Sequence, residues 1–210
     1  MLGVFKSILV LAPHTDDGEL GAGGTIHKLI ALGSQVDYVA FSSCEESVPE
    51  GFDKNILKKE VYSATERLGV TNVQVLDYKV RNFPQNRQKI LDDLILIRRE
   101  KNYDLVLLPS SSDLHQDHKT ISEEGIRAFK NTSILGYELI WNNLTSSSTC
   151  FSKLSRENVK AKVESMGEYK SQQGRAYTSE GFITSLATTR GVQIGCEFAE
   201  CFEVIRLIIE

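Results

Sequence analysis

Two short segments combine histidine and aspartate at spacings that suit metal binding. One reads Ala-Pro-His-Thr-Asp-Asp (Ala12–Asp17), and the other reads His-Gln-Asp-His (His115–His118). A His-x-x-Asp pair plus a distant histidine supplies two imidazoles and one carboxylate, a set that leaves one metal coordination position open for water. The remaining Asp16, His115 and Asp117 are then available for acid–base chemistry on that water.

The elements around these segments alternate between strand and helix. The apolar runs that we expect to form parallel strands are Ser7–Leu11, Val36–Phe41, Val73–Leu76, Leu105–Leu108 and Leu135–Trp141. Between them we expect helices at about Ala22–Leu32, 53–68, 84–101 and Thr120–Phe129. Beyond them the sequence predicts helices over 155–169 and Ser179–Thr189 and a last strand over Cys201–Ile208. Strands that alternate with helices in this way indicate a parallel sheet with right-handed crossovers.

This rhythm predicts an α/β fold, a single Rossmann-like domain over residues 1–210 whose mostly parallel sheet has helices on both faces. The two histidine segments follow the first and the fourth predicted strands. In a doubly wound sheet of order 3-2-1-4-5 these strands are neighbours, and ligands bind in the crevice between them. We therefore expect the two segments to face each other.

Each segment alone also fits a less specific interpretation. Asp16 or Asp17 could cap the helix that follows, because aspartate is a common helix cap. The glycines Gly18, Gly21 and Gly23 do not match the Gly-x-Gly-x-x-Gly spacing of dinucleotide-binding loops. We expect these small residues to let the start of the helix pack closely beside the metal loop. Both segments fall at the predicted crevice, and this coincidence favours the functional interpretation.

The composition argues against two classes of partner. The net charge is −4, and no basic stripe suggests nucleic-acid binding. No apolar run is long enough to span a membrane, and the N-terminus lacks the apolar region of a signal peptide. We therefore expect a cytoplasmic protein that neither inserts into membranes nor binds nucleic acid.

The first segment and its continuation, Ala12–Ile26, closely resemble the first signature of the PIG-L/LmbE-like zinc-dependent N-acetylglucosaminyl deacetylases. His115–His118 resembles the second signature of that family, His-x-Asp-His. Towards the C-terminus, 170–172 resembles the family's Lys/His-Ser-Gln, and 199–202 resembles its Ala-Glu-x-Phe. The resemblance therefore extends over nearly the whole chain.

The resemblance implies a role for each residue of the two signatures. The implied zinc ligands, for one Zn²⁺ per chain with Fe²⁺ or Co²⁺ as alternatives, are His14, Asp17 and His118. Asp16 is the implied general base. A protonated His115 is implied to stabilise the transition state, with Asp117 behind it to orient it and to favour its charged form.

Two departures from the family pattern concern the substrate. The loop Ser42–Glu46 replaces a Thr-x-Gly-Glu-like sequence, and Leu57–Lys59 stands where the family often has an arginine. The acidic Glu45 and Glu46 disfavour a strongly anionic substrate. The expected partner is a small N-acetylated amino sugar conjugate, nucleotide or glycan precursor. The resemblance also implies a homo-oligomer, although no interface can be identified in the sequence.

Two other functions remain open at this point. His14-x-Asp16 with a distal histidine also supplies the two-His-one-carboxylate set of non-haem Fe(II) oxygenases. Such an enzyme is expected to have many short strands without intervening helices. A catalytically silent sugar-binding relative is the other alternative, although metal binding alone would require neither Asp16 nor His115.

Overall fold

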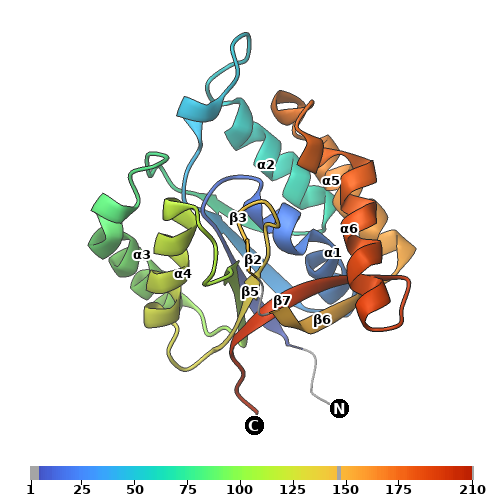
Figure 1. Cartoon of the computed structure of the whole chain (residues 1–210). Helices are drawn as coiled ribbons and strands as arrows, with labels where there is room; N and C mark the ends of the chain where they lie inside the picture. The colour runs from blue at the N-terminus through green and yellow to red at the C-terminus, as the bar shows by residue number, and fades with distance from the viewer. Residues whose placement is uncertain (1–4, 146–147, 210) are drawn as a thin grey trace.

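A seven-stranded sheet forms the centre of the computed structural model, which describes residues 5–145 and 148–209 (Figure 1). The strands are β1 (Ser7–Ala12), β2 (Gln35–Ala40), β3 (Asn72–Val75), β4 (Leu105–Pro109), β5 (Ser133–Tyr137), β6 (Ser148–Leu154) and β7 (Phe198–Arg206). Their order in the sheet is β3-β2-β1-β4-β5-β7-β6. The first five strands are parallel, whereas β7 pairs antiparallel with both β5 and β6. The predicted fold class and the predicted order 3-2-1-4-5 are confirmed.

Helices cover both faces of this sheet. The helices are α1 (Asp17–Ala31), α2 (Ile56–Arg67), α3 (Arg87–Glu100), α4 (Gln116–Ala128), α5 (Arg156–Gly167) and α6 (Glu180–Gln193). Alternate residues of β1 point to opposite faces. Ile8 and Val10 pack with α1, α2, α5 and α6, whereas Leu9 and Leu11 pack with α3 and α4 (Figure 1). Within the described ranges, none of these helices has the length and apolar character that a membrane crossing needs.

Helix α1 begins at Asp17, five residues before the predicted start near Ala22. The prediction was wrong because glycines usually disfavour the interior of a helix. Here two of them are required by close packing. A Cβ on Gly21 would lie 2.3 Å from Tyr137 Cδ2, and a Cβ on Gly18 would lie 2.6 Å from Tyr38 Cε2. The glycines therefore let α1 approach β2 and β5, as expected from their small size.

Other element ends also differ from the prediction, and one strand was not predicted. Helix α4 begins at Gln116 rather than at Thr120, and β5 ends at Tyr137 rather than at Trp141. Strand β6 was missed because it begins with polar residues and lies at the edge of the sheet, where it pairs only with β7. Together, β7 and β6 extend the parallel sheet on the β5 side.

A carboxylate of β7 anchors α1 from the far end of the chain. Glu200 Oε1 accepts a hydrogen bond from the backbone N–H of Gly24 at 3.0 Å, and its Oε2 accepts one from Thr25 at 2.7 Å. The Lys162 ammonium of α5 lies 2.7 Å from Glu200 Oε1. The Ala-Glu-x-Phe resemblance thus corresponds to a buried contact among α1, α5 and β7.

Candidate metal centre

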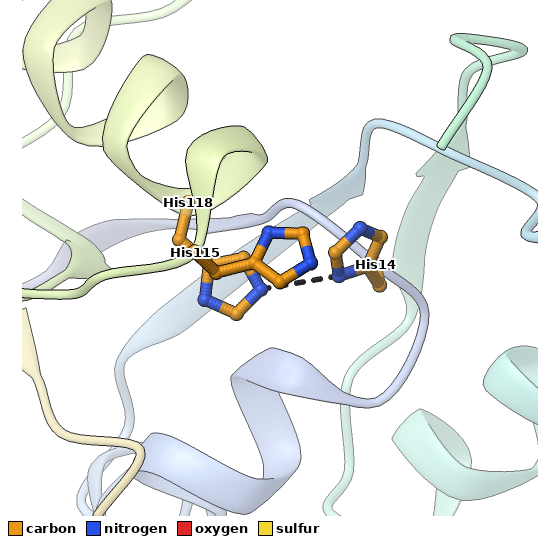
Figure 2. Close-up of side chains that lie close together, drawn as sticks. All are labelled: His14, His115 and His118. Atoms are coloured by element: carbon orange, nitrogen blue, oxygen red, sulfur yellow. Dashed lines mark hydrogen bonds between the residues drawn. The ribbon is translucent and has the colours of Figure 1, made fainter. Parts of the chain in front are cut away.

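Two loops bring three histidines together at the carboxyl ends of β1 and β4 (Figure 2). His14 lies between β1 and α1, His115 immediately precedes α4, and His118 lies in the first turn of α4. Strands β1 and β4 are paired, so the loops that follow them are neighbours. The ligand atoms of the three imidazoles lie within 4.8 Å of one another. The predicted meeting of the two segments is confirmed.

The tightest group of ligand atoms consists of two imidazole nitrogens and one carboxylate oxygen. His14 Nδ1 lies 3.0 Å from Asp17 Oδ2, and His118 Nε2 lies 3.2 Å from the same oxygen. The two nitrogens are 3.1 Å apart. A tetrahedral zinc with ligands at about 2.0–2.2 Å holds neighbouring ligand atoms roughly 3.3–3.6 Å apart. The three groups therefore fit such an ion after a small outward movement.

The three imidazoles form a second, looser ligand set. His115 lies beside the tight group, with its ring centroid 4.5 Å from that of His118 and 5.0 Å from that of His14. Both sets share His14 and His118, and they differ in whether Asp17 or His115 is the third ligand. The shorter distances favour Asp17, which leaves His115 next to the open side of the centre.

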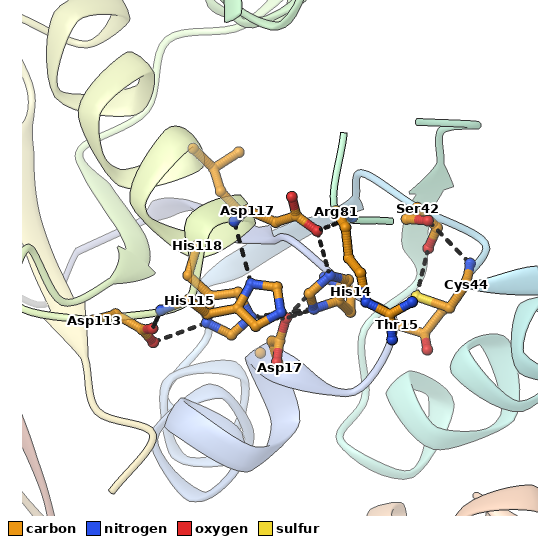
Figure 3. Close-up of polar contacts among 12 residues, drawn as sticks. His14, Thr15, Asp17, Ser42, Cys44, Arg81, Asp113, His115, Asp117 and His118 are labelled. Carbon is orange, nitrogen blue, oxygen red and sulfur yellow. Dashed lines mark hydrogen bonds and ion pairs between the residues drawn. The ribbon is translucent and has the colours of Figure 1, made fainter. Parts of the chain in front are cut away.

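Each of the two shared histidines contacts a buried carboxylate through its other nitrogen (Figure 3). His14 Nε2 lies 3.2 Å from Asp117 Oδ2, and His118 Nδ1 lies 2.8 Å from Asp113 Oδ2. Carboxylates in this position fix the ring orientation of metal-binding histidines and make them better ligands. Asp113 was not among the residues predicted from the sequence. Its position two residues before His115 was a usable signal, because a ligand histidine needs such a partner.

The structure corrects the interpretation of Asp117. Its carboxylate contacts His14 and accepts hydrogen bonds from the backbone N–H groups of Arg81, at 2.6 Å, and Phe83, at 3.3 Å. Only the backbone N–H of Asp117 reaches His115, where it donates to Nδ1. Burial and the neighbouring His118 and His14 lower the pKa of His115, so the structure does not favour the charged form that the sequence implied.

Asp16 lies in the capping position of α1, but its carboxylate makes no capping hydrogen bond. The capping interpretation of Asp16 is therefore wrong, and Asp16 is one of the residues that line the cavity above the histidines. Burial raises the pKa of Asp16 to about 6, with a further contribution from Asp17, while His14 and Arg175 act in the opposite direction. A carboxylate with a pKa near neutrality is suited to accept and return a proton.

The centre strongly stabilises positive charge. Burial by itself lowers the pKa of His14 and His118, but nearby carboxylates outweigh it. Asp17 and Asp117 raise the pKa of His14 to about 8, while Asp17 and Asp113 raise that of His118 to about 10. The same imidazoles hold the pKa of Asp17 well below its usual range despite its burial. A buried site that attracts protons so strongly is also suited to a divalent cation.

A cavity of about 360 Å³ opens above the centre. Asp16 and His115 lie in its wall, together with Cys44 of the loop Ser42–Glu46 and Leu57 in the first turn of α2. Both of these segments depart from the family pattern. The remaining wall includes Gln172, from the 170–172 motif, and Arg81, Trp141, Asn142, Arg175 and Tyr177, which were not predicted to lie there. A cavity of this size accommodates a sugar-sized ligand.

Part of the chain matches known proteins in sequence. The sequence model of the PIG-L family, described as GlcNAc-PI de-N-acetylase, matches residues 9–129. The diacetylchitobiose deacetylase of Thermococcus kodakarensis is 30% identical over 132 residues, which make up 59% of this chain and 49% of that protein. This chain therefore matches about half the length of that curated relative.

Solved structures share the fold across almost the whole chain. N,N′-diacetylchitobiose deacetylase from Pyrococcus horikoshii has a TM-score of 0.80 at 23% identity, over 96% of this chain and 84% of that one. GalB from Pseudomonas putida KT2440, a 4-carboxy-2-hydroxymuconate hydratase, has a TM-score of 0.78 at 18% identity, over 98% of each chain. Because a hydratase shares the fold with a deacetylase, the fold alone does not determine the reaction.

Proposed function

The chain belongs to the PIG-L family, and on that premise we propose that it removes the N-acetyl group from an N-acetylglucosamine-type amino sugar. This membership confirms the resemblance that its two motifs predicted. The observation that carries the proposal is the group formed by His14, Asp17 and His118 beneath the cavity, with Asp16 and His115 in the wall. The products are acetate and the free amine.

We assign the metal to His14, Asp17 and His118, with one Zn²⁺ per chain as the sequence predicted. Fe²⁺ and Co²⁺ accept the same ligand types and are the alternatives to test. When bound, such an ion polarises a carbonyl group and makes water a stronger nucleophile at neutral pH. Asp117 and Asp113 support this assignment because they orient the two histidines.

Asp16 is the proposed general base. Asp16 lines the cavity next to Asp17 in the sequence, and its carboxylate is not used to cap the helix. In the first step it accepts a proton from water as the water oxygen bonds to the acetyl carbon. In the second step the carbon–nitrogen bond breaks, and Asp16 returns that proton to the departing amine. One carboxylate can perform both transfers because its pKa lies near neutrality.

His115 is the proposed donor to the acetyl oxygen as that oxygen gains negative charge. The Nδ1 atom of His115 accepts a hydrogen bond from the backbone N–H of Asp117. In the neutral ring the proton therefore lies on Nε2, which is available as a donor. This arrangement replaces the protonated His115 expected from the sequence with a neutral ring in a fixed tautomer.

The alternatives receive less support from the structure. The described elements alternate between strand and helix, unlike the helix-poor fold that the oxygenase interpretation requires. A silent sugar-binding relative would not need an uncapped Asp16 or a positioned His115 at the cavity. The cytoplasmic location and the homo-oligomer stay predictions, as does the assignment of residues 1–210 to one domain.

Acetate release tests the proposal. The protein is stripped of metal, reloaded with Zn²⁺, Fe²⁺ or Co²⁺, and supplied with N,N′-diacetylchitobiose or with simple glycosides of N-acetylglucosamine. We expect metal-dependent release of acetate and a free amine in equal amounts. The Asp16→Asn variant should retain metal but release acetate at least about a hundredfold more slowly. No acetate with any metal, or equal rates for the variant and the wild type, would refute the proposal.

A further inference from the structure

Two arginines line the same cavity as the histidines but lie on separate loops. Arg81 lies between β3 and α3, and Arg175 follows the short turn Lys170–Gln172. Among the described residues, neither guanidinium has a carboxylate within ion-pair distance. Of the other eight arginines, Arg98, Arg99 and Arg206 likewise have no ion pair in the described part of the chain but do not line the cavity. The remaining five pair with carboxylates: Arg67, Arg87, Arg127, Arg156 and Arg190. The cavity therefore holds two positive charges that are not neutralised by a direct ion pair.

The backbone of Arg81 is fixed to the support of the metal centre. Arg81 has a φ of 68°, a left-handed conformation that residues with a Cβ rarely adopt. Its N–H donates to Asp117 Oδ2, and its carbonyl oxygen accepts from Gln116 Nε2 at 3.1 Å. Figure 3 shows its side chain extending from the Asp117 side past His14 towards Cys44. The backbone of Arg81 is therefore held in place by hydrogen bonds, and its guanidinium extends along the cavity.

Arg175 belongs to an aromatic part of the same wall. Its guanidinium donates to the Tyr177 hydroxyl, and the Tyr177 ring stacks on Trp141 with centroids 4.3 Å apart and an interplanar angle of 20°. Trp141 is 38% exposed, which leaves part of its ring available to a ligand. Aromatic side chains with an apolar body and a polar edge are suited to contact a sugar. This wall can therefore bind a sugar beside a positive charge.

We infer that the substrate carries an oxyanion, a carboxylate or a phosphate, on the group attached to its amino sugar, and that Arg81 and Arg175 bind it. This inference rests on the proposed function. A guanidinium presents several donors in a planar fork that matches both anions. The acetamide would lie at the metal centre, with the anion farther along the cavity.

The acidic loop does not oppose this inference. Glu45 and Glu46 were expected to disfavour a strongly anionic substrate, but neither lines the cavity. Glu46 instead faces the Lys79 ammonium at 3.9 Å. Leu57 lines the cavity and belongs to the segment where the family often has an arginine. The positive charge in this cavity comes instead from Arg81 and Arg175, which lie on other loops.

Fluorescence of Trp141 tests binding without turnover, because the chain has one tryptophan. All proteins carry Asp16→Asn to prevent hydrolysis. The probes are N-acetylglucosamine 1-phosphate, the carboxymethyl glycoside of N-acetylglucosamine and the neutral methyl glycoside. We expect at least one anionic probe to bind about tenfold or more tightly than the methyl glycoside, and the better probe identifies the anion.

Substitutions assign that preference to the two arginines. Arg81→Gln and Arg175→Gln should each weaken binding of the anionic probe about tenfold more than binding of the methyl glycoside. Arg81→Lys should retain part of the preference, since it keeps the charge and loses the fork. Arg156→Gln removes an exposed arginine of α5 outside the cavity lining and is the matched control. Equal affinity for all three probes, or equal weakening of all three by the arginine variants, would overturn the inference.

Acetate release separates this inference from the proposed function. If the wild type hydrolyses all three glycosides equally well and the arginine variants do the same, the deacetylase proposal stands and the inference fails. If the anionic probes bind in an arginine-dependent way but none releases acetate, the anion site stands and the deacetylase proposal fails.

Discussion

The two ends of the cavity differ in how firmly their side chains are held. At the metal end, the His14 side chain is 13% exposed and that of His118 is 3% exposed, and each contacts two carboxylates. At the outer end, Arg175 and Trp141 are exposed and held mainly through Tyr177. The metal end is therefore pre-organised for one chemistry, whereas the outer end can adapt to a particular substrate.

This comparison makes distinct predictions for the two ends. Changes at the metal end should reduce metal binding or turnover, while changes at the outer end should affect the binding of substrate alone. Each variant below is judged by three measurements: bound metal per chain, kcat and KM for acetate release.

The largest effect is expected from the loss of a ligand. His118→Ala removes one of the three proposed ligands and leaves Asp17 and Asp113 without the imidazole that both contact. Metal content and acetate release should fall together by more than about a hundredfold. Loss of a carboxylate that merely orients a ligand already weakens metal affinity or activity by up to about a hundredfold, and loss of the ligand itself should have a larger effect. Elemental analysis after gel filtration measures the metal. Wild-type metal content in this variant would contradict the ligand assignment.

The paired aspartates should then separate binding from chemistry. Asp16→Asn should retain the metal and lose about 10²–10⁴-fold in kcat, since it removes the proton acceptor. Asp17→Asn should lose the metal itself, because its carboxylate faces both histidines. The two variants are isosteric with the wild type and serve as controls for each other. The reverse pattern would exchange the two roles.

A smaller effect is expected for the carboxylates behind the histidines. Asp117→Asn and Asp113→Asn should each weaken metal affinity about 10–100-fold. With saturating metal, much of the turnover should return. Competition with a chelator measures the affinity. If Asp117→Asn lowers kcat while metal affinity stays at the wild-type value, Asp117 acts through His115 as the sequence analysis expected.

The smallest effect is expected at the outer end. Trp141→Ala removes one ring of the stacked pair but touches no ligand of the metal centre. KM should rise about 2–10-fold, while kcat and metal content stay unchanged. This pattern is expected because the ring contacts the substrate equally well in the ground state and in the transition state, so its loss weakens binding without slowing the chemical step. Steady-state kinetics with a matched set of glycosides measures this. A large fall in kcat would show that the outer end also positions the reacting group.

The sequence predicted the metal end better than the outer end. Parallel strands place their carboxyl ends at one edge of the sheet, so the loops after β1 and β4 could be paired without knowledge of any side chain. The cavity wall depends on Arg81, Trp141 and Arg175, which lie in loops of irregular backbone. No periodic pattern relates such residues, so their convergence follows only from tertiary structure.

The orientation of the Asp117 carboxylate, which differs from the one expected, has a local cause. Helix α4 begins at Gln116, so 117 and 118 lie within its first turn. Successive side chains on a helix diverge by about 100°. His118 can therefore face the cavity while Asp117 faces Arg81 and His14. A helix starting at Thr120, as predicted, would have left the two residues in an extended loop with no such constraint.

The contact between Glu200 and α1 has a consequence for synthesis of the protein. All the proposed metal ligands and their carboxylate partners lie within the first 118 residues, yet Gly24 in α1 bonds to a carboxylate 176 residues later. After His118, the last proposed ligand, a ribosome working at about 5–20 residues per second needs about 4–16 s to synthesise the interval up to Glu200. During this interval the nascent chain contains every proposed metal ligand, but helix α1, which begins with Asp17, lacks its contact with Glu200. The metal centre is therefore encoded early and stabilised late, when β7 joins the sheet.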